Sequence, residues 1–574
     1  MVWGKAVAHI IKEDLSVVLA GEAGQGIQTI EAILTRLLKR GGFNIFATKE
    51  YMSRVRGGVN STEIRIASHK VSAFLDRIDI LIPLNRESLP HLAYRTGENT
   101  LIIGEKDKIG AQGMLDVPFT KIGLELGNAI YANVVAVGMV AGLLGIDRTL
   151  CSDYTAEYFA RQPEDVRLKN REAVTRGHEI GVNLARETIW IEIKRDPGIA
   201  GDIMITGGEA VALGALAGGC NYLCAYPMSP ATSVLVNMAD YSKRADIIVE
   251  QVEDEVGVVN MAIGAWYAGA RAMASTSGGG FALMTEGISL AGAIETPLVV
   301  HVAQRPGPAT GLPTRTEQGD LNLVLYAGHG VFPRIILAPR SIEDAFILSR
   351  KAFDLADKHQ VPVFILTDQY LMDSYYNTPL FATEELRIGK YVTETKEDYA
   401  RYRLTENGVS PRGIPGHGSG IVRVDSDEHD EGGFITEDFI ETRNRMVEKR
   451  LRKFDAIRED IVTPILRGAR DYKTLLIGWG STFHALSEAM DRLDRKDVAM
   501  LHFSWLYPLP TGIREYLARA QTIVIIEGNA TAQFGDQLKL ATGVDIGNRI
   551  LKYNGMPFSV EELVEKIRPY TVRS

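Results

Sequence analysis

The stretch IIVEQVEDEVGVVNMAIGAWYAGARAMASTSGGG, residues 247–280, decides the fold. It opens with a short β-rich run, continues from Glu255 as a helix rich in glycine and alanine, and ends in the hydroxyl- and glycine-rich turn STSGGG. Other β-rich runs, ETPLVVHVAQ and VPVFILTD, follow it and alternate with helical runs. This alternation is typical of a mostly parallel sheet with helices on both faces.

The composition of the chain narrows its class. It has 574 residues, of which 45% are hydrophobic and 24% charged, and a formal net charge of -9. The negative charge argues against a surface for nucleic acid or anionic membranes. Three cysteines are too few for a disulfide framework or a four-cysteine iron–sulfur cluster, and they fit a reducing compartment. We therefore expect a cytoplasmic protein with no nucleic-acid or membrane partner.

The most apolar run, residues 129–146, is borderline in length for a membrane span. It contains Asn133 and several alanines and glycines. Small residues allow neighbouring backbones to approach closely, so this run predicts a buried, closely packed helix.

The pattern along the chain predicts three consecutive α/β domains, at residues 1–195, 196–455 and 456–574. The first contains LSVVLAGEAGQGIQTIEAILTRLLKRGG, which reads as strand, glycine loop, amphipathic helix and glycine stop. The last repeats the rhythm with YKTLLIGWGS, VAMLHFSW and TIVIIEGN. The central domain carries a long irregular extension at about residues 385–465, and such a segment usually serves a site or an interface.

The motif GEAGQG in the first domain stands between a strand and a helix. Exposed backbone N–H groups at such a helix start suit a phosphate or carboxylate, which makes Gly24, Gln25 and Gly26 candidate ligand-binding residues. A tight turn that needs glycine only for its shape would look the same. Arg54 and Arg56 in SRVRGG suit anionic groups, although a solvated charged turn is the alternative.

Chemistry-bearing residues gather in the loops of the central domain. They lie in the hydroxyl loop YPMSPATS, the acidic run EDE, the STSGGG turn and a proline- and glycine-rich loop that carries Arg305. The carboxyl ends of parallel strands are where α/β folds place their sites. Glu253 and Asp254 are ordinary acids at a helix start. Glu255, in contrast, would point back into the fold, where an acid needs a partner.

Together these motifs resemble the α subunits of the 2-oxoacid:ferredoxin oxidoreductases, with the family's γ domain fused ahead of the α domain. The motifs that carry the resemblance are GEAGQG, RVRGG, YPMSPATS, EDEVGVVNMAIGA, TSGGG with LMTEGISLAG, QRPGPATGLPT…QGD, RYRLTENGVSPRGIPG…EHDE and NRMVEKR. The resemblance covers nearly all of the chain. It implies a thiamine-diphosphate-binding, pyrimidine-type doubly wound sheet in the central domain and a transketolase C-terminal-like last domain. The fused order and the GVSPR…EHDE segment look most like the 2-oxoglutarate-type enzymes.

The resemblance also implies roles for single residues. Glu255 matches the glutamate that hydrogen-bonds N1′ of the thiamine aminopyrimidine and favours the imino form that removes the thiazolium C2 proton. Glu253 and Asp254 are the alternatives for this position. Ser229 stands where the family has a threonine whose hydroxyl faces the 2-oxoacid. Arg305 matches an arginine that holds the substrate carboxylate by a fork-like pair.

Further contacts follow from the same resemblance. The expected cofactor-binding residues beside Glu255 are Tyr226, Pro227, Thr276, Ser277 and Gly278. A second acid group, as in 2-oxoglutarate, would need a second cation, supplied by Arg315 or by a partner subunit. Thr310 is a further candidate for contact with substrate or coenzyme A. The glycine loop with Arg54 and Arg56 is the candidate coenzyme A site.

Two motifs of a complete thiamine site are missing from the sequence. There is no Gly-Asp-Gly followed by an asparagine to hold Mg²⁺ on the pyrophosphate, and there are no cluster cysteines. The resemblance therefore implies that thiamine diphosphate is shared with a separate β subunit, which carries the Mg²⁺ and at least one [4Fe–4S] cluster. The expected assembly is an (αβ)₂ heterotetramer. We expect no metal on this chain; His429 in DEHDEGG could suggest one, but solvated acidic loops are commoner.

The implied reaction is oxidative decarboxylation of 2-oxoglutarate with coenzyme A, which yields succinyl-CoA, CO₂ and reduced ferredoxin. The reductive direction, as in a reductive TCA cycle, would use the same residues. One alternative is the same enzyme class acting on pyruvate or a branched-chain or aryl 2-oxoacid. The other is a non-catalytic scaffold that binds coenzyme A or a nucleotide. The presence of Glu255, Ser229 and Arg305 together speaks against the scaffold.

Overall fold

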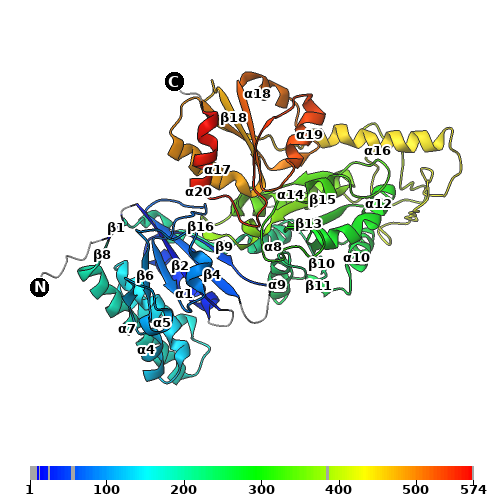
Figure 1. Cartoon of the computed structure of the whole chain (residues 1–574). Coiled ribbons are helices and arrows are strands. Elements are labelled where there is room, and N and C mark those ends of the chain that lie inside the picture. Colours follow the sequence, from blue (N-terminus) through cyan, green and yellow to red (C-terminus); the bar gives the residue numbers. More distant parts are fainter. Residues whose placement is uncertain (1–8, 12, 23–25, 54–57, 383–386, 572–574) are drawn as a thin grey trace, which may run out of the picture. The chain divides into compact units, whose positions relative to one another are not determined.

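The computed structural model describes residues 9–11, 13–22, 26–53, 58–382 and 387–571 (Figure 1). The chain divides into two compact units, each built on sheets flanked by helices, so the predicted α/β class is confirmed. Unit 1 comprises Met1–Ile205, Ser374–Leu380 and Ser559–Glu561. Unit 2 comprises Thr206–Asp373, Phe381–Phe558 and Glu562–Ser574. Among the described residues, no helix combines the length and apolar character that a membrane crossing requires.

Unit 1 is built on an eight-stranded mixed sheet. In spatial order its strands are β7 (Leu115–Asp116), β6 (Leu101–Gly104), β5 (Ile80–Pro83), β2 (Asp14–Glu22), β4 (Val59–Ala67), β3 (Asn44–Glu50), β16 (Tyr375–Thr378) and β9 (Ile203–Thr206). A two-stranded sheet of β1 (His9–Ile11) and β8 (Ile189–Ile191) accompanies it. The helices are α1 (Ile27–Arg40), α2 (Ser88–Leu92), α3 (Lys106–Ile109), α4 (Phe119–Glu125), α5 (Ala132–Leu143), α6 (Arg148–Tyr158) and α7 (Glu164–Glu187), with short 3₁₀ turns at Ala129–Tyr131 and Pro197–Gly201.

Strand β16 joins this sheet from far along the chain. It runs antiparallel to β3, with Tyr375 opposite Ala47. The side chain of Asn377 accepts a hydrogen bond from the backbone N–H of Ile45 at 2.8 Å, and Tyr375 accepts one from Arg36 at 2.9 Å. The eight-stranded sheet is therefore completed only by residues that follow the first segment of unit 2, Thr206–Asp373, in sequence.

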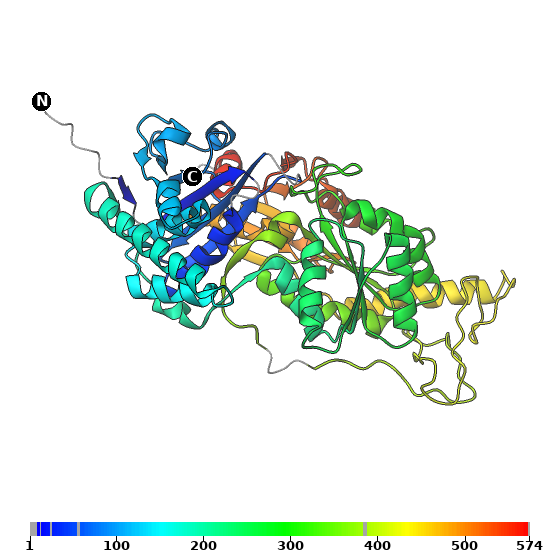
Figure 2. The same cartoon turned by 90° about the horizontal axis from the view of Figure 1, so that it is seen from below.

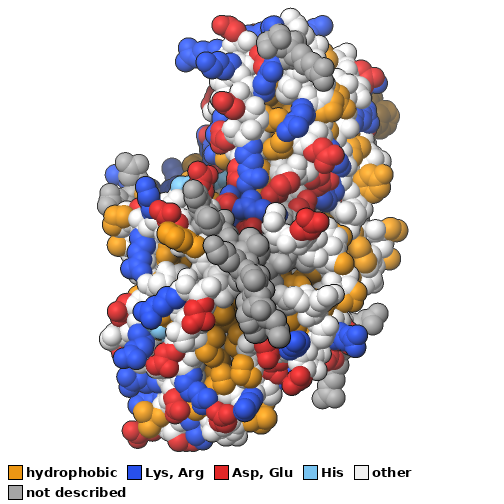
Figure 3. Space-filling model, turned by 60° about the vertical axis from the view of Figure 1, so that its left-hand side comes forward, with side chains coloured by type: hydrophobic (Ala, Val, Ile, Leu, Met, Phe, Trp, Pro, Cys, Tyr) orange, Lys and Arg blue, Asp and Glu red, His pale blue; other side chains and the backbone are white. Residues whose placement is uncertain are grey.

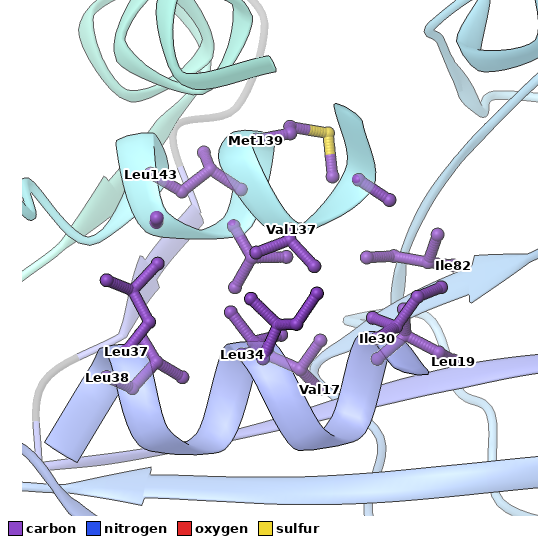
Figure 4. Packing of buried hydrophobic residues seen from close by; sticks show 14 of the residues in the cluster. Val17, Leu19, Ile30, Leu34, Leu37, Leu38, Ile82, Val137, Met139 and Leu143 are labelled. Carbon is purple, nitrogen blue, oxygen red and sulfur yellow. The ribbon is translucent and has the colours of Figure 1, made fainter. Parts of the chain in front are cut away.

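The core of unit 1 lies between β2, α1 and α5. The apolar face of α1 presents Leu34 and Leu37 toward Val137 and Leu143 of α5, above Val17 of β2 (Figure 4). The predictions of an amphipathic helix after the glycine loop and a buried helix in the most apolar run are both confirmed, by α1 and α5 respectively.

Four glycines allow α5 and α7 to pack backbone against backbone. They are Gly138 and Gly142 of α5 and Gly177 and Gly181 of α7. A Cβ atom added at Gly177, for example, would overlap the carbonyl oxygen of Val135. Since helix backbones cannot move apart without opening the core, only glycine fits at these crossing points.

Unit 2 contains a seven-stranded sheet with helices on both faces, seen among the green strands of Figure 2. In spatial order its strands are β11 (Ile248–Gln251), β10 (Tyr222–Ala225), β12 (Ala272–Thr276), β13 (Leu298–Gln304), β15 (Pro362–Asp368), β14 (Ile335–Leu337) and β20 (Trp505–Tyr507). All neighbours are parallel except β20, which runs antiparallel to β14. Its helices are α8 (Gly207–Ala217), α9 (Thr232–Tyr241), α10 (Glu255–Tyr267), α11 (Gly278–Phe281), α12 (Thr285–Ala293), α13 (Leu321–Leu325), α14 (Ile342–His359) and α15 (Gln369–Asp373), with a 3₁₀ turn at Ala282–Met284.

A five-stranded sheet forms the rest of unit 2. Its order is β17 (Ile465–Gly468), β19 (Val498–Phe503), β18 (Thr474–Trp479), β21 (Thr522–Glu527) and β22 (Asn548–Leu551). Only the edge strand β17 runs antiparallel to its neighbour. The helices of this part of the chain are α16 (Thr442–Arg458), α17 (Phe483–Leu493), α18 (Ile513–Arg519), α19 (Gln533–Thr542) and α20 (Val560–Ile567), with 3₁₀ turns at Gly480–Thr482 and Arg568–Tyr570.

A buried ion cluster attaches α16 to the seven-stranded part of unit 2. Glu295, just after α12, lies 2.7 Å from the ammonium of Lys449 and 2.6 Å from that of Lys453. All three side chains are at most 1% exposed. Burial opposes ionisation of Glu295, but Lys453 and Lys449 together hold its pKa well below the ordinary value. Arg401, in the irregular extension, donates to the carbonyl oxygen of Glu295.

The expectation that His429 belongs to a solvated acidic loop is wrong. His429 is fully buried, and its ring packs in a tilted arrangement against Tyr402 at a centroid distance of 3.8 Å. The neighbouring acid, Glu428, is not free in solvent either, because it pairs with Arg450 at 2.9 Å and with Arg443. The sequence DEHDEGG therefore folds against α16.

We predict that Gly177→Ala lowers the free energy of unfolding by about 2–3 kcal/mol, because the new methyl group overlaps the backbone of α5. Urea unfolding of the purified chain measures the change. Gly97→Ala is the matched control, since a Cβ atom there meets nothing within 4 Å and the expected change is within about 0.5 kcal/mol. Equal stability of the two variants would contradict the close approach of α5 and α7.

We predict that Glu295→Gln lowers the free energy of unfolding by about 3–5 kcal/mol, because Lys449 and Lys453 lose their buried counter-charge. The matched control is Asp491→Asn, which breaks an exposed pair with Arg467 and should cost less than about 1 kcal/mol. Chemical denaturation of both variants gives the comparison. A loss at Glu295 no larger than that of the control would mean that the cluster does not hold α16.

Candidate active site

The candidate site lies at the point where the strand order of the seven-stranded sheet reverses. From β10 the chain passes first to β11 on one side and then to β12 on the other. β11, β10, β12 and β13 are mutually parallel, so the loops that follow them leave the same edge of the sheet. A crevice outside the carboxyl ends of the strands at such a reversal is the usual ligand site of open α/β sheets. The prediction that these loops meet at one edge is confirmed.

Of the three neighbouring acids, Glu255 is the one that points into the fold. Asp254 caps α10 by accepting a hydrogen bond from the backbone N–H of Gly257 at 2.7 Å, and Glu253 is exposed. Glu255 is 3% exposed and accepts a long, 3.5 Å hydrogen bond from the Thr276 hydroxyl. Burial raises the pKa of Glu255, while hydrogen bonds from its own backbone amide and from Thr276 oppose the rise.

The turn after β12 is shaped around this carboxyl group. A Cβ atom at Gly280 would overlap both the Glu255 carboxyl oxygen and the Thr276 hydroxyl. Ser277 is fully buried, and its hydroxyl has no hydrogen-bond partner within the described chain. The glycines of STSGGG therefore let a carboxyl group, two hydroxyl groups and the backbone crowd into one small volume.

The structure also brings Arg305 and the hydroxyl loop together. The Arg305 guanidinium donates to the carbonyl oxygen of Ser229 at 2.8 Å. Tyr226, at the start of the same loop, is 40% exposed, and Pro227 is half-buried. After Arg305 the chain folds back over the glycine turn, since the Ala309 carbonyl oxygen lies 3.5 Å from a Cβ position at Gly279.

Two further predicted contacts lie elsewhere on this long loop. Thr310 is exposed. Arg315 packs its side chain against Gly555 and donates to the sulfur of Met556 at 3.4 Å. The roles assigned to Thr310 and Arg315 stay predictions.

Asp320 is a member of the site to which the sequence reasoning assigned no role. Its carboxyl group lies against Gly278, where any Cβ atom would overlap it, and its Oδ2 atom is buried without a hydrogen-bond partner in the described chain. Burial and the neighbouring Glu317 raise the pKa of Asp320 to about 6, and Arg305 opposes the rise. The sequence feature that could have identified Asp320 is its place in QGD, as an acid at the end of a long glycine-rich loop.

The unpartnered Ser277 hydroxyl and Asp320 carboxyl oxygen, beside a buried glutamate with a raised pKa, leave hydrogen-bonding capacity for a ligand. The glycines at positions 278 and 280 keep this place free of side chains. Such a set fits a flat heterocycle with donors and acceptors on its edge, which is the character of the thiamine aminopyrimidine.

A separate cavity lies in unit 1 beside the first glycine loop. It has a volume of about 390 Å³. Its lining residues are Gly26, Pro83, Leu84, Glu105, Lys108, Ile109, Phe119, Thr120, Ala129, Ile130, Ala132 and Asn133. Gly26 caps α1 with a positive φ of 79°, and a Cβ atom there would overlap the side-chain amide of Asn133. Four candidate residues of this region, Gly24, Gln25, Arg54 and Arg56, lie outside the described residues.

The described part of the chain contains no group of three or more His, Cys, Asp or Glu side chains placed to hold a metal ion. Cys151, Cys220 and Cys224 are buried, and burial raises the pKa of each thiol to about 12. On the face drawn in Figure 3, acidic and basic side chains are interspersed.

Two family models match the chain. Residues 213–449 match pyruvate flavodoxin/ferredoxin oxidoreductase, thiamine diphosphate-binding. Residues 16–180 match pyruvate ferredoxin/flavodoxin oxidoreductase. The first match contains Ser229, Glu255, Arg305 and Asp320 with the STSGGG turn, and the second contains the cavity of unit 1.

Relatives match over nearly the whole length. The 2-oxoacid:ferredoxin oxidoreductase subunit alpha of a Sulfolobus species is 30% identical over 96% of each chain. The 2-oxoglutarate oxidoreductase subunit KorA of Mycobacterium tuberculosis is 29% identical, over 97% of this chain and 91% of its own. The solved 2-oxoglutarate:ferredoxin oxidoreductase of Magnetococcus marinus, with 2-oxoglutarate, coenzyme A and succinyl-CoA bound, is similar with a TM-score of 0.91 and 28% identity, over 97% of this chain and 99% of that one.

With a buried glutamate at the strand-order reversal and such relatives along its full length, the chain belongs to the 2-oxoacid:ferredoxin oxidoreductase α-subunit family, oxidoreductases with a thiamine-diphosphate-binding domain.

Proposed function

We propose that this chain is the α subunit of an enzyme that oxidatively decarboxylates 2-oxoglutarate with coenzyme A to succinyl-CoA, CO₂ and reduced ferredoxin, reversibly. The observation that carries the proposal is the buried Glu255 carboxyl group, held by Thr276 against Gly280 at the carboxyl edge of the sheet. At the same edge, Arg305 donates to the carbonyl oxygen of Ser229. A carboxyl group with a raised pKa beside unpartnered hydrogen-bonding atoms is typical of catalytic sites.

The choice of 2-oxoglutarate among 2-oxoacids rests on relatives. The Mycobacterium protein and the Magnetococcus structure are both named for 2-oxoglutarate, and both match this chain over more than nine-tenths of its length. The same enzyme class acting on pyruvate or a branched-chain or aryl 2-oxoacid is the alternative. Since Arg315 contacts Met556, we propose that the cation for the second carboxylate comes from the partner subunit.

In the proposed mechanism, each residue of this chain has a defined task. Thiamine diphosphate, when bound, would supply a carbon nucleophile for the 2-oxo carbon and an electron sink for the decarboxylation. Glu255 holds a proton that it shares with N1′ of the aminopyrimidine, and its burial favours this protonated form. Arg305 binds the substrate carboxylate, and Ser229 fixes the guanidinium through its carbonyl oxygen.

The remaining parts of the reaction are assigned to partners. The described residues offer no metal cluster, so we propose that a β subunit supplies Mg²⁺, the pyrophosphate site and a [4Fe–4S] cluster that passes electrons to ferredoxin. An (αβ)₂ assembly is the proposed form.

For coenzyme A we propose the cavity in unit 1. It combines the amino terminus of α1, whose backbone N–H groups suit a phosphate, with Lys108 and an apolar wall of Ile109 and Phe119 for an adenine ring.

We predict that Glu255→Gln in the complete enzyme lowers turnover of 2-oxoglutarate by about 10²–10⁴-fold, because the amide cannot move a proton to and from N1′. Anaerobic reduction of a viologen dye with coenzyme A and 2-oxoglutarate measures it, with pyruvate compared in parallel.

Glu253→Gln is the matched control, because Glu253 is exposed and two residues away; its turnover should stay within about twofold of the unmodified enzyme. Unchanged turnover in Glu255→Gln would refute the catalytic assignment. Activity on pyruvate alone would keep the enzyme class and reject the substrate.

We predict that Ala129→Trp raises the KM for coenzyme A more than about tenfold, because the indole fills the cavity from its exposed rim. The KM for the 2-oxoacid should stay within about twofold, as measured by steady-state kinetics of the complete enzyme. Leu124→Trp, exposed but outside the cavity lining, is the control. Equal effects of the two tryptophans would place coenzyme A elsewhere.

A further inference from the structure

Asp320 occupies an unusual position within unit 2. It closes the long loop after β13, and its carboxyl group rests on the backbone of Gly278, in the same glycine turn whose Gly280 contacts the Glu255–Thr276 pair. Both of its carboxyl oxygens come so close to Gly278 that no side chain could replace the glycine hydrogen. The carboxyl group therefore lies against the glycine turn of the candidate active site.

The backbone around Asp320 is fixed from two sides. Its N–H donates to the Gln304 side chain at 3.0 Å, and Gln304 in turn donates to the Thr367 carbonyl oxygen at 3.1 Å. From the five-stranded part of unit 2, Gln533 donates to the carbonyl oxygen of Gly319 at 2.8 Å. With both sides held, the carboxyl group cannot turn out to solvent by a small movement of the loop.

Two charged groups act on the Asp320 carboxyl group, and both lie on the loop that follows β13. Arg305 follows β13 and is near enough for its charge to act on the carboxyl group, but its guanidinium donates a hydrogen bond to the carbonyl oxygen of Ser229. Glu317 lies on the same loop and adds a like charge. Glu255 of α10 is the next carboxyl group, on the far side of the glycine turn. In the five-stranded sheet, the Glu527 carboxyl group accepts hydrogen bonds from the backbone N–H groups of Phe534 and Gly535.

This arrangement conflicts with a permanently ionised Asp320. An ionised carboxylate needs hydrogen-bond donors on both oxygens when it is buried, and Oδ2 has none among the described residues. If Arg305 binds a substrate carboxylate, as in the proposed function on which this inference rests, two negative groups would share one guanidinium. A proton on Oδ2 removes this repulsion and turns the unpartnered atom into a donor.

We propose that Asp320 is a substrate-binding acid, which takes up one proton from solvent when a 2-oxoacid carboxylate binds Arg305 and then donates that proton in a hydrogen bond from Oδ2 to the bound 2-oxoacid.

The coupling makes substrate affinity depend on pH. Free Asp320 is mostly ionised at pH 7.5, since its pKa is raised only to about 6. Binding must therefore draw a proton from solution, and the apparent affinity falls as the pH rises. The expected weakening is about tenfold per pH unit above neutrality, as linkage requires for one proton.

Titration calorimetry tests the proposal on the unmodified enzyme. The assembled enzyme, loaded with the unreactive analogue thiamine thiazolone diphosphate, is titrated with 2-oxoglutarate at pH 7.5 in buffers of different ionisation enthalpy. The dependence of the heat on the buffer counts the protons exchanged. We expect uptake of about one proton per 2-oxoglutarate bound.

Variants then assign the proton to its residue. Asp320→Asn keeps the shape and a donor but cannot ionise, so it should bind 2-oxoglutarate with no proton uptake and with a pH-independent KM. The matched control is Glu317→Gln on the same loop, which should keep the uptake of the unmodified enzyme.

The outcomes separate this inference from the proposed function. Binding of 2-oxoglutarate without proton uptake, or uptake that persists in Asp320→Asn, overturns the role of Asp320 and leaves the enzyme class intact. Failure of both 2-oxoglutarate and pyruvate to bind overturns the proposed function, and the inference with it.

Discussion

Gln318 makes four hydrogen bonds through its side chain and backbone, and these bonds fix the loop that carries Asp320 in the candidate site. Its side-chain amide donates to Trp479 at 3.0 Å and accepts from Gly528 at 2.9 Å; its backbone N–H donates to Gly528 and its carbonyl oxygen accepts from Asn529. Buried polar groups must be paired, so this loop can close over the seven-stranded sheet only where the five-stranded sheet offers those partners. The five-stranded part of unit 2 thus determines where the loop that ends at Asp320 lies.

The local sequence pattern was sufficient to predict most helices and strands and the inward orientation of Glu255. Alternation and glycine punctuation predicted the strands and the α1 and α5 helices, and the small-residue helix after Glu255 indicated its burial. The same reasoning could not find β16 or β20, because a short strand chooses its sheet by long-range pairing that leaves no periodic signal. His429 was misjudged because acidic neighbours suggest solvent, whereas Glu428 is paired with arginines on α16.

Charge is used in two different ways within unit 2. At Glu295 two lysines surround one carboxylate, so the group stays ionised and fastens the extension to the body of the unit. At Asp320 and Glu255 burial outweighs the nearby charges and hydrogen bonds and raises the pKa of each carboxyl group. The first arrangement gives rigidity away from the sheet edge, and the second leaves proton-carrying groups at the edge where a ligand can use them.

The position of β16 has a consequence for synthesis on the ribosome. Strand β3 cannot gain its second neighbour until residues 375–378 have left the exit tunnel, and by then most of the seven-stranded sheet has already emerged. At usual translation speeds this interval is on the order of tens of seconds, during which one side of β3 is an open edge. An open edge invites pairing with other nascent chains, so slow elongation or crowded polysomes would impair the yield of this protein more than that of one with sequential domains.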